Sequence, residues 1–211
     1  MFDNKVLNSN QVHIIPMLGF LKSRNVYLGG GTALAMQVGH RTSVDLDFFS
    51  EQNQPMQLIV SELQKAIKNL VITRIEEHTL FAKAGDTDIS LFYYPYKLLN
   101  PFVEHKSLYL ASIEDIVAMK IAAIIQRGTR RDFVDIYYLL QDFSLKQMLE
   151  LTRNKFPGYQ DSMALRALIY FEDADSEDIA RGIQVFDKDY SWEKAKKKIL
   201  SEVKKYQRSL L

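Results

Sequence analysis

The chain has 211 residues, 47% hydrophobic and 25% charged, which is ordinary for a soluble globular protein and enough for one large domain or two small ones. It has no cysteine, which excludes disulfides, thiolate zinc sites and cysteine nucleophiles and fits a reducing cytoplasm. The net charge of +1 gives no global reason to bind nucleic acid or anionic lipid. With no apolar run of about 18 residues and no signal-peptide pattern, we expect a cytoplasmic protein without a membrane segment.

The first hundred residues alternate between helix and strand patterns. Apolar residues at helical spacing predict helices over residues 10–24, where Pro16 can introduce a kink, 32–38 and 56–70. In the last of these helices we expect Leu58, Leu63, Ile67 and Leu70 to face the core. Runs of β-branched and aromatic residues bounded by turn signals predict strands over residues 25–29, 43–49, 71–78, 79–85 and 87–95. Tight connections between the last three favour antiparallel pairing.

After about residue 110 the pattern is helical throughout. Ser112 and Asp115 resemble a capping box that opens a helix ending near Arg127, and Gly128 separates it from the next. The following helices are predicted near residues 130–143, 144–155, 160–171, 176–186 and 191–208. The order predicts an α+β fold, with a mixed α/β domain over residues 1–110 and a helical domain over residues 111–211.

Two aspartates lie one residue apart in the predicted strand over residues 43–49. Because alternate residues of a strand point to one face, Asp45 and Asp47 project together, about 7 Å apart at their Cα atoms, while Val44, Leu46 and Phe48 face the core. Paired carboxylates repel unless a cation lies between them, and Mg²⁺ prefers one or two carboxylates plus phosphate oxygens. A solvated strand edge is the alternative explanation for such a pair.

Three glycines, Gly29 to Gly31, end a predicted strand and precede the helix that begins near Thr32. Backbone without a Cβ can approach a phosphate closely, and the N–H groups at a helix N-terminus bind anions. A simple turn would explain the glycines alone. Followed by the aspartate pair, they favour a site that holds a nucleoside triphosphate at one end and its Mg²⁺ at the other.

The segment GGGTALAMQVGHRTSVDLDFFS, residues 29–50, resembles the signature of the AbiEii/AbiGii-type nucleotidyltransferases of the DNA-polymerase-β-like superfamily. The matching features are the glycines, the Gly39-His40-Arg41 triplet and the Asp-x-Asp pair flanked by apolar residues. A second block, residues 113–140, resembles the downstream signature of the same family. Its matching positions are Lys120, Arg127, Arg131, Asp132 and Asp135. Two blocks in the expected order are far more specific than either alone.

The second block also has a physical explanation of its own. Lys120 and Arg127 are seven residues apart and share a helix face, where two cations can neutralise triphosphate charge. A structural network of ion pairs between two helices is the alternative explanation for Arg127, Arg131, Asp132 and Asp135.

One position departs from the superfamily pattern. A third carboxylate is usual on a neighbouring strand, but alignment of Ile89 and Leu91 puts Ser90 there, with Asp88 two residues earlier on the same face. Asp88 or Asp132 can replace it, or the enzyme is weakened. The aromatic run after this strand fits a packed turn.

The resemblance implies a nucleotidyltransferase-like mixed sheet with flanking helices and Mg²⁺-dependent transfer of a nucleoside monophosphate from an NTP to an acceptor. In some members the acceptor is tRNA, and the cellular role implied is that of a toxin with a cognate antitoxin, or of phage defence. The implied metal ligands are Asp45 and Asp47, which with Lys120, Asp132 and Asp88 form the catalytic set. The implied nucleotide-binding residues are Gly29, Gly30, Gly31, Thr32, His40, Arg41, Arg127 and Arg131.

Two other functions remain as alternatives: a non-catalytic nucleotide-binding or protein-interaction module on this fold, and a nucleotidyltransferase acting on a small molecule such as an antibiotic. The basic C-terminal segment, residues 191–208, is explained best as a solvated amphipathic helix, and contact with an RNA backbone is its alternative role.

Overall fold

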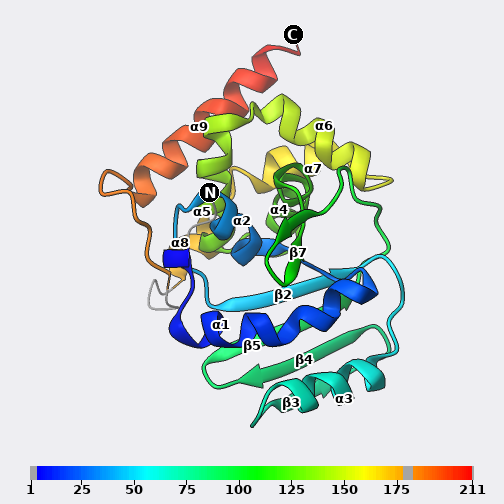
Figure 1. Cartoon of the computed structure of the whole chain (residues 1–211). Coiled ribbons are helices and arrows are strands. Elements are labelled where there is room, and N and C mark those ends of the chain that lie inside the picture. Colours follow the sequence, from blue (N-terminus) through cyan, green and yellow to red (C-terminus); the bar gives the residue numbers. More distant parts are fainter. Residues whose placement is uncertain (1–3, 178–182, 211) are drawn as a thin grey trace. The chain divides into compact units, whose positions relative to one another are not determined.

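A seven-stranded mixed sheet forms the centre of the first of two units, Met1–Ser112, in a computed structural model that describes residues 4–177 and 183–210 (Figure 1). The strand order is β3-β4-β5-β2-β1-β7-β6. The pairs β2–β5 and β1–β7 are parallel and the other neighbours are antiparallel. The strands are β1 (Tyr27–Leu28), β2 (Asp45–Ser50), β3 (Val71–Ile75), β4 (Thr79–Ala84), β5 (Thr87–Tyr93), β6 (Val103–His105) and β7 (Leu108–Leu110). The mixed sheet expected from the sequence is confirmed.

Strand β2 has the alternation that the sequence predicts. Leu46 and Phe48 are buried, whereas Asp45, Asp47 and Phe49 are half-buried on the opposite face. The predicted antiparallel pairing of β3, β4 and β5 is also confirmed. Strands β6 and β7 were not predicted, because each has only three residues and too short a pattern to detect.

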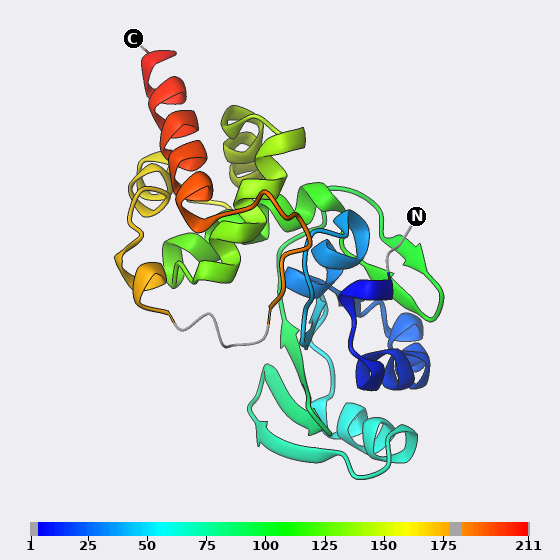
Figure 2. The same ribbon diagram turned by 90° about the vertical axis from the view of Figure 1, so that its left-hand side faces the viewer.

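The helical segments of this unit are η1 (Asn4–Val6), α1 (Ser9–Ile14), η2 (Ile15–Arg24), α2 (Gly30–Val38) and α3 (Met56–Ala66). The single helix predicted over residues 10–24 is an α-helix followed by a ten-residue 3₁₀ helix. Pro16 lies at the junction and has no N–H to continue the α-helical hydrogen bonds. In both views, α1, η2 and α3 lie on one side of strands β3 to β5 (Figures 1 and 2).

One predicted core residue of α3 was wrong. Leu58 is 56% exposed, and Ile59 is buried in its place together with Met56 and Leu63. These three residues recur at the i, i+3, i+7 spacing of a single helix face, which leaves Leu58 outside it. Ile67 is buried as expected.

The second unit, Ile113–Leu211, is helical over the residues that the structure describes. Its helices are α4 (Ile113–Gln126), α5 (Arg130–Asp142), α6 (Leu145–Lys155), α7 (Asp161–Ala167), α8 (Glu172–Ser176) and α9 (Trp192–Arg208). Helix α6 packs on α4, where the fully buried side chains of Lys155 and Asp115 form an ion pair of 2.7 Å. No helix among the described residues is long and apolar enough to cross a bilayer.

The helices predicted over residues 160–171 and 176–186 differ from the structure. Helix α7 ends at Ala167, and α8 ends at Ser176, where the second prediction begins. Residues 178–182 lie outside the described residues, and residues 183–186 are not helical. In the latter stretch Ile183 and Val185 alternate with Gln184, which favours extended backbone over helix.

Candidate active site

The glycine turn and the aspartate pair are in direct contact within the first unit. The N–H of Gly29 donates to the carbonyl oxygen of Asp47 at 2.9 Å, and helix α2 begins at the next residue. Gly30 has a φ of +61°, and a Cβ added to it would lie 3.3 Å from Oδ2 of Asp47. A glycine therefore lets the start of α2 lie against this carboxylate, in a backbone conformation that other residues adopt only with strain.

The register of β2 and β5 shows which residues lie beside the two aspartates, where the family pattern has a third carboxylate. Asp45 pairs with Asp88, and Asp47 pairs with Ser90. Because paired residues of neighbouring strands project to the same face, this face carries three aspartates and a serine. Asp88 is largely exposed, and its Oδ1 lies 3.7 Å from Nζ of Lys83. The register thus leaves the position beside Asp47 without a carboxylate, as the alignment of the sequence suggested.

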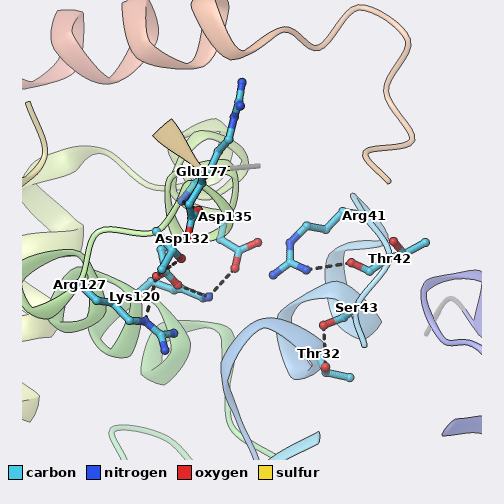
Figure 3. A network of polar contacts seen from close by, with 11 residues as sticks. Thr32, Arg41, Thr42, Ser43, Lys120, Arg127, Asp132, Asp135 and Glu177 are labelled. Carbon is cyan, nitrogen blue, oxygen red and sulfur yellow. Dashed lines mark hydrogen bonds and ion pairs between the residues drawn. The ribbon is translucent and has the colours of Figure 1, made fainter. Parts of the chain in front are cut away.

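Thr32, expected to bind nucleotide, is buried and has its hydroxyl engaged inside the fold. Its Oγ1 lies 2.7 Å from Oγ of Ser43 and also donates to the carbonyl oxygen of Asp45 (Figure 3). Thr32 therefore connects helix α2 to the start of β2 and positions the aspartates. Ser43 was missed from the sequence because a single serine before a strand has no distinguishing pattern.

His40 and Arg41 follow the end of α2, which is closed by Gly39 at a φ of +73°. Both side chains are buried, and Nη1 of Arg41 donates to the carbonyl oxygen of Thr42 at 2.8 Å (Figure 3). A buried guanidinium is costly unless it is paired, so Arg41 is held in a defined place.

The donor set of β2 fits a magnesium ion. Among residues 4–177 and 183–210 no three His, Cys, Asp or Glu side chains are arranged as a complete metal cage. Mg²⁺ does not need one, because it binds through one or two carboxylates and completes its shell with water and phosphate oxygens. Asp45 and Asp47 offer two hard oxygen ligands on one face, and the absence of a Cβ at Gly30 leaves room beside Asp47.

In the second unit, Lys120 lies between two aspartates. Its Nζ is 2.9 Å from Oδ1 of Asp132 and 2.6 Å from Oδ2 of Asp135 (Figure 3). All three side chains are nearly or fully buried. Lys120 comes from the middle of α4, whereas both aspartates come from the first half of α5, and the three residues are called the lysine cluster below. The pairing of Lys120 with these two aspartates was not predicted from the sequence.

Asp132 has further partners that keep it ionised. Oδ2 accepts a hydrogen bond of 2.6 Å from the hydroxyl of Thr129, and Nε of Arg127 lies 3.3 Å away. Burial alone would raise the pKa of Asp132, but the charges of Lys120 and Arg127, with hydrogen bonds from Thr129 and Lys120, lower it to about 2. Thr129, at the N-cap of α5, was missed, although a threonine before a helix is a recognisable signal.

The two arginines differ from the lysine cluster in exposure. The side chain of Arg127 is 62% exposed, so its guanidinium can contact both Asp132 and a ligand from solvent. Arg131, in the first turn of α5, is half-buried. The ion pair of Arg127 with Asp132 belongs to the structural network considered from the sequence, whereas Lys120 was not part of that alternative. Such a network is compatible with a role in binding phosphate.

Comparison with known proteins identifies the family of the chain. Residues 20–102 and 97–208 match the family described as "Nucleotidyl transferase AbiEii toxin, Type IV TA system". The uncharacterized protein aq_aa25 of Aquifex aeolicus (strain VF5) is 32% identical over 186 residues, which are 85% of this chain and 87% of that protein.

Two solved structures share the fold. JHP933 from Helicobacter pylori has a TM-score of 0.58 at 14% identity, over 100% of this chain and 98% of the other. MenT4, a nucleotidyltransferase toxin from Mycobacterium tuberculosis H37Rv, has a TM-score of 0.55 at 17% identity, over 92% and 82%. With a family match over most of its length and a nucleotidyltransferase fold, the chain belongs to the AbiEii nucleotidyltransferase toxin family.

Proposed function

We propose that the protein transfers a nucleoside monophosphate from an NTP to a hydroxyl of an acceptor RNA, such as a tRNA, with Mg²⁺ bound by Asp45 and Asp47. The observation that carries the proposal is the contact between Gly30 and Asp47 beside a second carboxylate on the same face. This arrangement joins a helix N-terminus that favours phosphate to ligands that favour Mg²⁺. The main-chain N–H groups of Gly30 and Gly31, at the start of α2, are the ones we propose for phosphate oxygens, because the N–H of Gly29 is already bonded to Asp47.

The reaction has a simple balance of bonds. The acceptor oxygen forms a bond to the α-phosphorus of the NTP, the bond from this phosphorus to the bridging oxygen breaks, and pyrophosphate leaves. When bound, Mg²⁺ would neutralise the charge that develops on the phosphate oxygens. Asp45 and Asp47 would hold that ion, and the start of α2 would bind phosphate oxygens, so that the NTP is oriented toward the acceptor and the entropic part of the barrier is lowered.

Asp88 is the candidate we propose for the proton of the acceptor hydroxyl. It lies beside Asp45 in the register of β5 and is open to solvent. Asp132 is a poor choice because a pKa of about 2 makes it a weak base, and its two oxygens are already bonded to Lys120, Thr129 and Arg127.

We assign the lysine cluster to the same reaction because both sequence blocks match one family. Asp132 and Asp135 hold the ammonium group of Lys120 in a fixed orientation, and Lys120 would neutralise phosphate charge. Arg127 and Arg131, with His40 and Arg41, are the further residues that we propose for the triphosphate.

Labelling of different acceptors tests the proposal and separates it from the alternatives. The protein is incubated with each α-³²P-labelled NTP and Mg²⁺, with either total RNA or an aminoglycoside as the acceptor. The proposal predicts label in RNA. Label in the aminoglycoside alone would favour the small-molecule enzyme, and NTP binding without any transfer would favour the non-catalytic module.

The cellular role we propose is that of a toxin controlled by a cognate antitoxin, because the family is described as a toxin of type IV TA systems. Induced expression in a bacterial host should arrest growth, and Asp47→Asn should abolish the arrest while leaving the amount of protein unchanged. Arrest that persists in this variant would separate toxicity from nucleotide transfer.

A further inference from the structure

Helix α9 has a charge that differs sharply from that of the chain as a whole. It contains seven Lys or Arg residues and two Glu residues, a net charge of +5. The whole chain has a net charge of +1, so the remaining residues have a net charge of −4. The positive charge of this protein is therefore concentrated on one helix at the end of the second unit (Figures 1 and 2).

The helix divides into faces of different character. Ala195, Ile199 and Val203 are buried where α9 packs on α5 and α6. Lys196 and Lys198 lie toward the flanks. Lys196 is paired with Asp175 and Glu193, and Lys198 is paired with Glu202. These contacts account for part of the positive charge within the fold.

A third group of cations faces solvent, and we call it the basic stripe: Lys197, Lys204 and Arg208. Its members lie at positions i, i+7 and i+11, which fall on one helix face, with the exposed Ser201 between them. All three are exposed, and none of them has an ion pair with another residue in the part of the chain that the structure describes. At 1.5 Å per residue the stripe is about 16 Å long.

The start of α9 packs against the first turn of α5. The ring of Trp192 lies 5.9 Å from that of Phe133, the residue after Asp132, and 5.9 Å from that of Phe171. The guanidinium of Arg130 lies 4.9 Å from the Trp192 ring. The stripe begins at Lys197, between one and two turns after Trp192, and continues to the C-terminal end of α9.

We propose that the basic stripe binds the phosphate backbone of the acceptor RNA. This inference rests on the proposed function. A linear row of unpaired cations suits a polyanion whose charges repeat along a line.

A protein partner fits the stripe less well. Protein interfaces are depleted in lysine and enriched in aromatic residues around an apolar centre. On α9 the apolar face is already buried within the unit, so the stripe offers only charge. Charge without an apolar centre is typical of contacts to nucleic-acid phosphates, which position the ligand without selecting its sequence.

The test compares two triple variants of the full chain. Lys197→Gln/Lys204→Gln/Arg208→Gln removes the stripe. Lys65→Gln/Lys68→Gln/Lys146→Gln removes three other exposed lysines and gives the same net charge. The affinity for a fluorescein-labelled tRNA transcript is measured by anisotropy between 50 and 200 mM salt, without NTP. Circular dichroism melts establish that both variants are folded.

Each phosphate contact contributes about 0.7 to 0.9 to the slope of log affinity against log salt. Loss of three contacts should lower the magnitude of this slope by about 2 to 3. When the salt rises from 50 to 200 mM, the affinity of the stripe variant for RNA should therefore fall about 20- to 40-fold less than the affinity of the wild type does. The control triple variant should keep the wild-type slope, and so should Asp47→Asn, which lacks only a metal ligand.

The outcomes separate the inference from the proposed function. If the wild type labels RNA but the stripe variant keeps the wild-type slope, the inference is wrong and the proposed function stands. Polyglutamate and unlabelled RNA are compared as competitors at equal total charge. If polyglutamate displaces the labelled transcript as efficiently as RNA does, the stripe binds anions in general and the inference is also wrong. If the wild type labels no RNA at all, the proposed acceptor fails, and this inference fails with it.

Discussion

Asp47 and Ser90 lie opposite one another on the adjacent parallel strands β2 and β5. The same register places Asp45 opposite Asp88, so the carboxylates of this face are displaced by two residues from the arrangement that the family resemblance implies. A serine binds a metal weakly and is a poor base, whereas a carboxylate at the same place would face the proposed ion directly.

Replacing Ser90 tests this relationship. Ser90→Asp should lower the melting temperature without metal, because a second carboxylate beside Asp47 adds repulsion. Mg²⁺ should then raise the melting temperature of the variant more than that of the wild type. Ser162→Asp, at an exposed position of α7, is the control and should respond as the wild type does. An equal response to Mg²⁺ in all three proteins would argue against a metal beside Asp47.

Two glycine variants separate backbone strain from contact with the aspartate. Gly30 and Gly158 both have positive φ, at +61° and +80°, so alanine at either position should cost about 1 kcal/mol or more of stability. Only at Gly30 would the new methyl group meet Oδ2 of Asp47, at 3.3 Å, while at Gly158 it meets nothing within 4 Å. Calorimetry should therefore find at least about tenfold weaker binding of NTP with Mg²⁺ in Gly30→Ala alone. Similar affinities in the two variants would contradict the proposed contact.

Replacing Lys120 should lower the free energy of unfolding by an amount that depends on pH. Lys120→Met leaves Asp132 and Asp135 buried without a cation, which typically costs about 3 to 5 kcal/mol. Without Lys120, burial raises the carboxyl pKa values, so the variant should be less destabilised at pH 5 than at pH 8. Urea unfolding at both pH values measures the difference.

Lys155→Met is the matched control for this prediction, because Lys155 forms a comparably buried ion pair with Asp115 that has no proposed role in the reaction. Both variants should lose stability. Below their unfolding temperatures, only Lys120→Met should also lose NTP affinity, and an equal loss in the two variants would make the lysine cluster purely structural.

The contribution of Asp132 to the free energy of unfolding should disappear at low pH. Its folded pKa of about 2 lies below the ordinary value near 4, so its contribution is complete above about pH 4 and is lost as the pH falls toward 2. The shift corresponds to roughly 2 kcal/mol. The stability difference between the wild type and Asp132→Asn, from urea unfolding at pH 7, 4, 3 and 2, should shrink by about this amount below pH 4. A difference that is constant down to pH 2 would refute the lowered pKa.

Much of the fold was predictable because local patterns and tertiary packing agree. The alternation around Asp45 and Asp47 is strong enough to give both the strand and its buried face. Leu58 was misplaced because any helix with several leucines offers more than one apolar stripe, and only packing within the folded unit, where α3 contacts η2, selects Ile59. The short strand β7 is stabilised by pairing with β1, and β6 by pairing with β7, which no local pattern reveals.

The candidate site was predictable where residue type and spacing are specific. The contact of Gly30 with Asp47 follows from a turn that joins neighbouring segments of chain. The hydrogen bonds of Thr32 and Thr129 are different, because a threonine hydroxyl has many partners available and only the folded backbone selects Ser43 or Asp132. The lowered pKa of Asp132 likewise depends on Lys120, twelve residues away and on another helix.

The central claim is tested most directly by following the two ends of the triphosphate in parallel. Wild-type protein and Asp47→Asn are incubated with total RNA, Mg²⁺ and an NTP labelled with ³²P at either the α- or the γ-phosphate, with Asp142→Asn as a control at an exposed aspartate. We predict that the wild type and the Asp142→Asn control transfer α-label but no γ-label to the RNA. Asp47→Asn should transfer neither, and no protein should transfer label in EDTA. Transfer of γ-label, or α-label transferred equally well by Asp47→Asn, would contradict the central claim.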